Sequence, residues 1–240
     1  MIYGTRAVIE AIAAGKEIDK VMVQSGLSND LVKELIAVAR NNNIPITFVP
    51  AEKLKRISSK NHQGVICLLS IVSFASVDDL IYKAYNEGRE PFFLILDRVT
   101  YVRNFGAIVR TAECAGVDGI IIPDKGSVPI TSDAMKTSAG ALNHLPICRE
   151  KDLKKAIQLL HDNGIRVVAC TEKTERSIYQ LSLKGPVTII LGSEEDGISD
   201  VLLRQADDLA QIPLKGKIGS LNVSVAAGIA LYEVVRQKGL

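Results

Sequence analysis

The sequence predicts an α/β protein in which a carboxyl-terminal parallel sheet is preceded by a smaller α/β unit. Two observations indicate this class. From residue 92 onward, short and wholly apolar stretches alternate with helical patterns, and the clearest of them are 92–96, 120–122, 167–169 and 187–191. Strands that are apolar along their whole length are typical of a parallel sheet covered on both faces. The first 72 residues alternate helix and strand patterns on a smaller scale.

The first part of the chain contains its elements in a regular order. Apolar residues at helical spacing predict a helix over 7–14 that ends at Gly15, and a second over 31–39 that begins with Ser28 or Asn29 as its cap. Pro50 begins a short basic helix that ends at Arg56. Strands are expected at 21–23, 46–49 and 65–72. We assign residues 1–72 to the first domain.

A polar stretch separates the two parts. Residues 73–90 carry Ser73, Ser76, Asp78 and Asp79 around one expected helix. We interpret this stretch as a linker and assign residues 91–240 to the second domain.

The composition limits the kinds of partner. The 240 residues are 47% hydrophobic and carry a formal net charge of +2, so a nucleic-acid site must be a local patch. Aromatic residues make up 5% and tryptophan is absent, which argues against an extended base-stacking platform.

The four cysteines and the amino-terminal residues favour a cytoplasmic protein. Cys67, Cys114, Cys148 and Cys170 are widely spaced, with no CxxC pair and no histidine at zinc-ligand spacing. We interpret them as buried thiols in a reducing compartment, and we expect no metal. The chain begins without a basic, apolar leader and has no apolar run of about 18 residues, so we expect no export and no membrane span.

Ligands of open parallel sheets bind beyond the carboxyl ends of strands, so the loops there are the candidate sites. The loop after the strand 92–96 carries Arg98 and Arg103, and Arg110 follows on the next helix. Surface arginines are usually solvated or paired, and both readings stand for Arg98 and Arg103. Apolar neighbours of Arg110 predict a largely packed helix, and a buried guanidinium needs partners, which makes Arg110 a candidate site residue.

The loop 191–197 is acidic and bounded by glycines. It looks like a phosphate loop, but the required Lys-Ser/Thr is replaced by Ile198-Ser199, and three adjacent carboxylates would repel phosphate. The chain has no GxGxxG, so a Rossmann dinucleotide site lacks support. This acidic loop suits a sugar hydroxyl, a cationic ligand or a structural pairing with an arginine.

The third candidate is the segment 211–238, in which Ile212-Pro213 leads to Ser220, Asn222 and Ser224 at the start of a long apolar helix. Free backbone N–H groups there favour an electron-rich ligand, although Ser220 as a simple cap is the alternative.

Two further features concern the first domain and the histidines. Residues 53–63 form a basic and polar run that suits RNA contact or a solvated face equally well. The three histidines are far apart in sequence, which does not support a metal centre or a Ser-His-Asp triad.

The three loops together resemble the motifs of the SpoU family of RNA ribose 2′-O-methyltransferases, within the knotted SPOUT enzymes. The stretch Asn104–Ala112 resembles the first motif, N-x-G-x-x-x-R-x-A, and 191–197 resembles the second. Ile212-Pro213 with Ser220–Ala226 resembles the third. The amino-terminal part, with Ile2-Tyr3-Gly4 and His62–Val65, is similar to the RNA substrate-binding domain of the bacterial 23S rRNA guanosine methyltransferases. The likeness covers nearly the whole chain.

The resemblance implies a fold, a cofactor and an assembly. We expect a SPOUT domain with a deep trefoil knot at residues 91–240, preceded by an α/β substrate-binding domain. S-adenosyl-L-methionine would be held by backbone groups at Gly192, Ile212 and Leu221, with its adenine among nearby apolar side chains. A homodimer is implied as well.

The resemblance also assigns roles in catalysis. Arg110 would handle the ribose 2′-hydroxyl and the adjacent phosphate, while Asn104, Glu194, Ser220 and Asn222 would orient the reacting groups. The family often has Asp-Pro in the turn before the motif asparagine, where this chain has Tyr101-Val102-Arg103. Without the fixed φ of proline we expect a different loop geometry but retained activity.

The expected reaction is 2′-O-methylation of a guanosine in 23S rRNA. A tRNA ribose methyltransferase uses the same chemistry and is the first alternative. A non-catalytic RNA-binding or ribosome-assembly factor on the same scaffold is the second.

Overall fold

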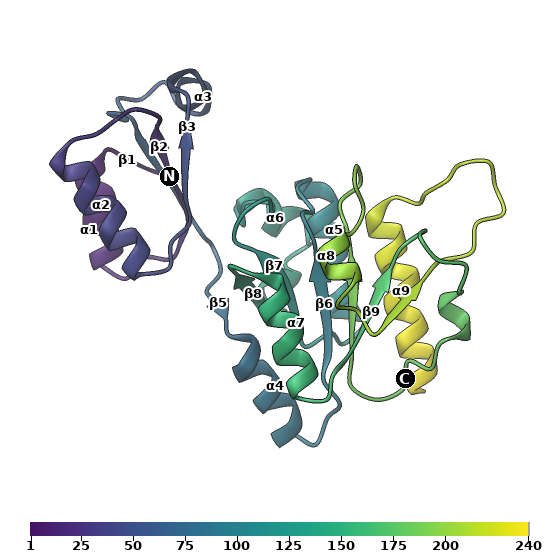
Figure 1. The fold of residues 1–240 in the computed structure, drawn as a ribbon. Coiled ribbons are helices and arrows are strands. Elements are labelled where there is room, and N and C mark those ends of the chain that lie inside the picture. Colours follow the sequence, from purple (N-terminus) through teal and green to yellow (C-terminus); the bar gives the residue numbers. More distant parts are fainter. Residues whose placement is uncertain (240) are drawn as a thin grey trace. The chain divides into compact units, whose positions relative to one another are not determined.

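The computed structural model describes residues 1–239, and its contacts divide the chain into two units, which are described separately (Figure 1). The first unit comprises Met1–Ser73 together with Pro129–Ser132, and the second comprises the rest of the described chain. Residue 240, the last of the predicted second domain, lies outside the described residues.

The first unit is built on a four-stranded sheet with the order β1-β4-β2-β3, in which only β2 and β3 are parallel. Its strands are β1 Ile2–Tyr3, β2 Ile18–Gln24, β3 Ile46–Val49 and β4 Val65–Leu69. Its helices are α1 Thr5–Ala13, α2 Asp30–Asn41 and α3 Ala51–Ile57. Helices α1 and α2 pack against each other and form a core with one sheet face, while Leu54 of α3 is buried in a second, smaller cluster.

Local chemistry sets two boundaries that the sequence left open or misplaced. Asn29, not Ser28, caps α2, because its side chain accepts a hydrogen bond from the backbone of Val32 at 2.9 Å. Strand β4 stops at Leu69 and does not continue to residue 72. The hydroxyl of Ser70 donates to the carbonyl of Val72 at 2.7 Å, which turns the chain away from the sheet.

A seven-stranded sheet forms the second unit, and all its pairings are parallel. Its order is β11-β9-β10-β6-β7-β8-β5, so the strand sequence reverses between β6 and β10. The strands are β5 Phe74–Ala75, β6 Phe92–Leu96, β7 Gly119–Pro123, β8 Ile147–Glu150, β9 Arg166–Cys170, β10 Val187–Leu191 and β11 Asp208–Ala210. The predicted parallel sheet is confirmed, and the reversal marks the edge where a ligand is expected.

Helices cover both faces of this sheet (Figure 1). The helices are α4 Val77–Asn86, α5 Val102–Cys114, α6 Ser132–Thr137, α7 Leu153–Asp162, α8 Asp200–Leu203 and α9 Val223–Lys238. Side chains of α4, α7 and α8 share a core with Phe93, Ile95 and other strand residues. The alternate residues Phe92, Leu94 and Leu96 point to the opposite face and are also buried. Helices α5 and α9 pack against each other.

The stretch 73–90, which the sequence indicated as a linker, belongs to the second unit from Phe74 onward. Phe74 and Ala75 form the edge strand β5, which pairs with β8. The expected helix is α4, and the side chain of Ser76 caps it by accepting from the backbone of Asp79. Polar composition there reflects the exposed face of a packed helix.

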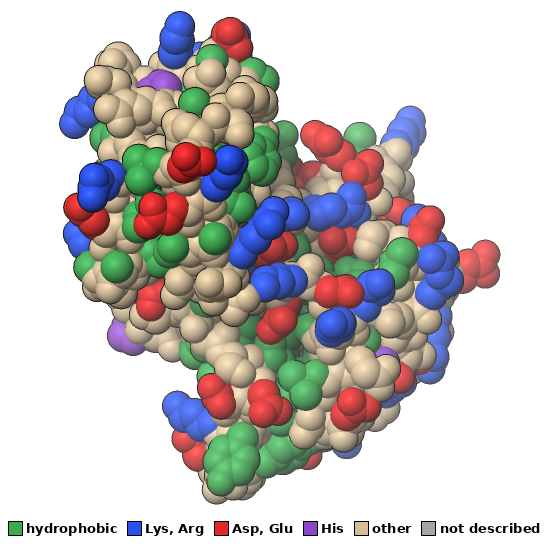
Figure 2. Space-filling model, turned by 60° about the vertical axis from the view of Figure 1, so that its left-hand side comes forward, with side chains coloured by type: hydrophobic (Ala, Val, Ile, Leu, Met, Phe, Trp, Pro, Cys, Tyr) green, Lys and Arg blue, Asp and Glu red, His purple; other side chains and the backbone are tan. Residues whose placement is uncertain are grey.

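The surface carries charges of both signs. On the face shown in Figure 2, acidic and basic side chains are interspersed with apolar patches. Among residues 1–239, no helix is long and apolar enough to cross a membrane, and no group of three or more His, Cys, Asp or Glu is arranged to hold a metal ion.

Candidate active site

Three polar side chains meet at the start of α5 and α9. Asn104, in the first turn of α5, donates through Nδ2 to Oε1 of Glu194 in the loop after β10. Asn222 donates through its Nδ2 to Oδ1 of Asn104 and to Oε1 of Glu194, both at 3.3 Å. These residues come from the three loops that the sequence singled out, so the fold brings parts of all three together.

Asn222 also begins α9. Its Oδ1 accepts from the backbone N–H of Ser224 at 2.9 Å and from the Ser224 hydroxyl at 2.6 Å. Asn222 is therefore the cap of the helix, and Ser220 lies two residues before it in an exposed loop. The interpretation of Ser220 as a simple cap is wrong, which leaves its hydroxyl available to a ligand.

A pocket of about 630 Å³ adjoins this cluster at the carboxyl ends of the strands. Six of the eight predicted site residues line it: Gly192, Glu194, Ile212, Ser220, Leu221 and Asn222. Its apolar side chains are Leu191, Ile212, Leu214, Leu221, Val223 and Ala226. The remaining walls combine backbone, neutral polar side chains and four carboxylates, a mixture suited to a ligand with an apolar ring and a positive charge.

Two glycines of the motifs lie where chain segments approach closely, and one of them, Gly192, lines the pocket. A Cβ on Gly192 would lie 2.0 Å from the carbonyl carbon of Gly197, so the two ends of the loop pass with no space for a side chain. Gly106, on the buried face of α5, has the same constraint, because a Cβ there would lie 2.1 Å from Oγ1 of Thr137. Both glycines are required by close approach of chain segments.

One wall of the pocket was not predicted. Cys170 is the last residue of β9, the strand that pairs with β10, and it lines the cavity with Thr171 and Glu172, which follow it. The position of this loop after a parallel strand was the available signal, but its residues form no motif. Desolvation raises the pKa of the Cys170 thiol to about 12, so this side chain is a neutral pocket residue and no thiolate nucleophile.

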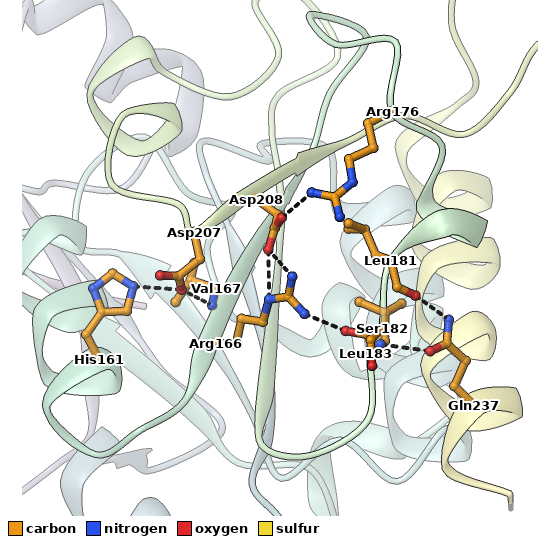
Figure 3. A network of polar contacts seen from close by, with 10 residues as sticks. All are labelled: His161, Arg166, Val167, Arg176, Leu181, Ser182, Leu183, Asp207, Asp208 and Gln237. Carbon is orange, nitrogen blue, oxygen red and sulfur yellow. Dashed lines mark hydrogen bonds and ion pairs between the residues drawn. The ribbon is translucent and has the colours of Figure 1, made fainter.

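A polar network fixes the segment that continues from this wall (Figure 3). Asp208 of β11 accepts from Arg166 Nε at 2.7 Å and from Arg176 Nη1 at 2.6 Å. Gln237, near the end of α9, donates to the carbonyl of Leu181 and accepts from the backbone of Leu183 at 2.9 and 2.8 Å. The segment 171–183 is thus held to the sheet edge and to α9.

Arg110 is not where its neighbours in sequence suggested. Phe105, Ile108, Val109 and Ala112 occupy the buried face of α5, whereas Arg110 is exposed on the opposite face. The expectation of a packed guanidinium is wrong, because position 110 falls outside the apolar stripe of this amphipathic helix. Within the described part of the chain Arg110 has no ion pair, and it does not line the pocket. Arg103 lies two turns earlier on the same exposed side.

The turn before α5 lacks the Asp-Pro pair that the family often has there. Tyr101 occupies the cap position and makes no side-chain capping bond, and Val102 is the first helical residue. An Asp-Pro pair would supply a capping carboxylate and a preset φ at these positions. Helix α5 nevertheless begins at Val102, so Asn104 lies in its first turn and its side chain contacts Glu194.

Comparisons with known proteins cover both units. A model of the family described as "SpoU rRNA Methylase family" matches residues 91–232, and one described as "RNA 2′-O ribose methyltransferase substrate binding" matches residues 1–74.

Relatives extend over nearly the full chain. A Bacillus subtilis protein named in the TrmH family of tRNA/rRNA methyltransferases is 32% identical over 99% of this chain and 95% of its own length. A Staphylococcus saprophyticus protein with the same family name is 34% identical over 99% and 96%. The crystal structure of an AdoMet-bound rRNA methyltransferase from Sinorhizobium meliloti superposes with a TM-score of 0.62, at 27% identity, over 95% of this chain and 84% of that one.

Proposed function

This chain belongs to the SpoU rRNA methylase family, and we propose that it methylates the ribose 2′-hydroxyl of a guanosine in 23S rRNA. It is an S-adenosyl-L-methionine-dependent RNA methyltransferase. The observation that carries the proposal is the convergence of Asn104, Glu194 and Asn222 at the mouth of the pocket.

The pocket fits S-adenosyl-L-methionine in size and chemistry. Its volume of about 630 Å³ lies in the range of sites for ligands of this size. Apolar side chains of Ile212 and Leu221 would flank the adenine, and the exposed carboxylates of the 193–197 loop would compensate the positive charge. When bound, the cofactor supplies an electrophilic methyl group on sulfur, whose departure needs no acid.

The side chains around the pocket have the task of positioning. A 2′-hydroxyl is a poor nucleophile at neutral pH, so it must be held in line and partly deprotonated with water excluded. Asn104, Glu194 and Asn222 orient one another and present amide and carboxylate groups to the ribose. Ser220 adds an exposed hydroxyl at the same rim.

Arg110 is the proposed electrostatic partner of the nucleophile. A guanidinium stays protonated at neutral pH and is therefore a poor general base. We assign Arg110 to the stabilisation of the developing alkoxide and to binding of the adjacent phosphate, with that phosphate or a transiently neutral guanidine as the proton acceptor. The exposure of Arg110 in the isolated chain suits a residue whose partner is the RNA.

The first unit offers a surface for RNA. Lys53, Lys55, Arg56 and Lys60 are all exposed, and no ion pair within residues 1–239 involves them. Lys60 Nζ lies 5.5 Å from the centre of the Tyr3 ring, which adds an aromatic face to the basic patch. Unpaired cations beside an aromatic ring support phosphate contact and the stacking of one base, and we place the RNA there.

We further propose a homodimer and a knotted chain. Val225 and Tyr232 lie seven residues apart on α9 and are each half exposed, so the helix presents an apolar stripe that a second copy would cover. The knot is what the resemblance of the second unit to the SpoU family implies. Tracing the chain in a crystal structure of the protein would test both.

The target RNA is tested in cells. In a strain that lacks this protein, mapping of 2′-O-methyl groups should show one guanosine of 23S rRNA unmethylated, and the gene should restore it. Loss at a tRNA position instead would favour the tRNA alternative, which the names of the relatives also admit. An rRNA target also places the protein in the cytoplasm.

Calorimetric titration with S-adenosyl-L-methionine separates the enzyme from a non-catalytic assembly factor. We expect saturable binding to one site per chain. Absence of binding by the folded protein would favour the assembly factor.

A further inference from the structure

Arg98 stands outside the residues that the motifs assign, and its backbone is unusual. It follows β6 directly and adopts a φ of +60°, in the left-handed region that side-chain-bearing residues rarely occupy. Such a conformation persists where the surrounding contacts hold it. The contacts that hold Arg98 are the hydrogen bonds of its guanidinium.

The Arg98 side chain spans the base of the pocket loop. Its Nε lies 3.1 Å from Oδ1 of Asp97, a carboxylate that is only 6% exposed. Its Nη1 reaches Oδ2 of Asp196 at 3.1 Å, and its Nη2 donates to the carbonyl oxygen of Gly197 at 3.1 Å. One guanidinium therefore joins the end of β6 to the far side of the loop that lines the pocket.

The same carbonyl closes the loop from within. The oxygen of Gly197 also accepts from the backbone N–H of Ser193 at 3.1 Å, so Arg98 reinforces the bond that gives the five-residue turn its shape. Asp97 receives a second donor, the backbone N–H of Ser199, at 2.7 Å. Arg98 and Asp97 thus fasten the carboxyl-terminal side of the loop to the end of β6, and Ser193 at the other end is bonded to Gly197, with Glu194 between them.

We propose that Arg98 is a positioning residue for cofactor binding and methyl transfer, which holds the Ser193–Gly197 loop in the shape that lines the pocket and presents Glu194 to Asn104 and Asn222. This inference rests on the proposed function. A loop held in advance loses less conformational entropy when a ligand binds, so Arg98 acts mainly on affinity for S-adenosyl-L-methionine. The sequence left open whether the acidic loop binds a cationic ligand or pairs with an arginine. Its Asp196 makes the pairing, with Arg98.

The test separates this role from simple stabilisation through Arg98→Gly. Glycine adopts a φ of +60° without strain, so the variant should stay folded, with a melting temperature lowered because the nearly buried carboxylate of Asp97 loses its guanidinium partner and keeps the Ser199 N–H. Its dissociation constant for S-adenosyl-L-methionine should nevertheless rise roughly tenfold, because charge-assisted contacts to the loop are lost. The KM for the cofactor should rise with the dissociation constant. The kcat at saturating cofactor should change less, and the KM for RNA should stay the same.

Three further variants complete the experiment. Arg98→Lys keeps the positive charge but loses the planar set of guanidinium donors, and should give an intermediate dissociation constant. Asp196→Asn removes the exposed contact without touching the backbone, and should weaken binding by only about two- to threefold. The matched control is Lys154→Ala, which breaks an exposed ion pair with Asp152 on α7 and should leave affinity unchanged.

The outcomes are distinct. Folded Arg98→Gly and Asp196→Asn proteins that bind S-adenosyl-L-methionine as tightly as the wild type would overturn the positioning role and leave the proposed function standing. A folded wild-type protein that fails to bind the cofactor would overturn both.

Discussion

Nδ2 of Asn222 lies 3.3 Å from Oδ1 of Asn104, although the two residues are 118 positions apart in the sequence. Glu194 accepts from both amides, so a single carboxylate connects the first turn of α5 to the cap of α9. This arrangement makes Glu194 the point at which the three loops depend on each other.

Replacement of Glu194 by alanine should therefore affect turnover more than folding. We expect kcat to fall roughly 10- to 100-fold, because the ribose-facing amides lose their common partner. Glu194 is exposed, so the melting temperature should shift little. Single-turnover methylation measures the change, and Glu113→Ala, on the exposed side of α5, is the matched control. Equal rates for both variants would contradict the role of Glu194.

Arg110→Ala should abolish methylation and retain cofactor binding. The residue lies outside the pocket, so the dissociation constant for S-adenosyl-L-methionine should stay within about twofold, while kcat drops at least ~100-fold through loss of electrostatic stabilisation. Arg110→Lys should recover part of the rate, because lysine keeps the positive charge but lacks the planar guanidinium. Near-normal turnover by the alanine variant would refute the assignment.

Gly192→Ala should damage the pocket itself. The added Cβ would meet the Gly197 backbone at 2.0 Å, and neither segment can move without disrupting the loop. We expect a loss of at least about 2 kcal/mol in the free energy of unfolding and loss of cofactor binding. Gly216→Ala is the control, because nothing lies within 4 Å of its Cβ position. Chemical denaturation and calorimetry report the two effects, and a fully stable, cofactor-binding Gly192→Ala protein would be inconsistent with the described loop.

The exposed stripe of α9 predicts the oligomeric state. Tyr232→Glu places a charge in the proposed apolar interface and should convert a dimer into a monomer in sedimentation velocity experiments. Tyr82→Glu, on exposed residue 82 of α4, should leave assembly unchanged. A wild-type monomer, or a Tyr232→Glu dimer of unchanged affinity, would disprove the interface.

The sequence predicted the parts of this structure that follow from local patterns. Apolar strands at 92–96 and 187–191 predicted the parallel sheet, and two of the three motif-bearing loops supplied six residues that line one pocket. These features depend on periodicity and on strand ends, both of which can be seen in the chain itself.

Other features depend on tertiary packing and could not be predicted. The exposure of Arg110 is not one of them, because the spacing of Phe105, Ile108 and Ala112 already places position 110 outside the apolar stripe of α5. The wall at Thr171–Glu172 carries no motif and joins the pocket only because β9 pairs with β10. The pairing of Arg98 with Asp196 crosses the sheet edge between residues 98 positions apart.

The central claim is transfer of a methyl group from S-adenosyl-L-methionine to a ribose 2′-hydroxyl. The direct measurement incubates the purified protein with methyl-labelled S-adenosyl-L-methionine and 23S rRNA from a strain lacking the protein, followed by alkaline hydrolysis. A 2′-O-methyl group blocks cleavage at its own linkage, so we expect label in one alkali-resistant dinucleotide that begins with guanosine. Label in single nucleotides with a methylated base, or no label in any RNA offered, would contradict it.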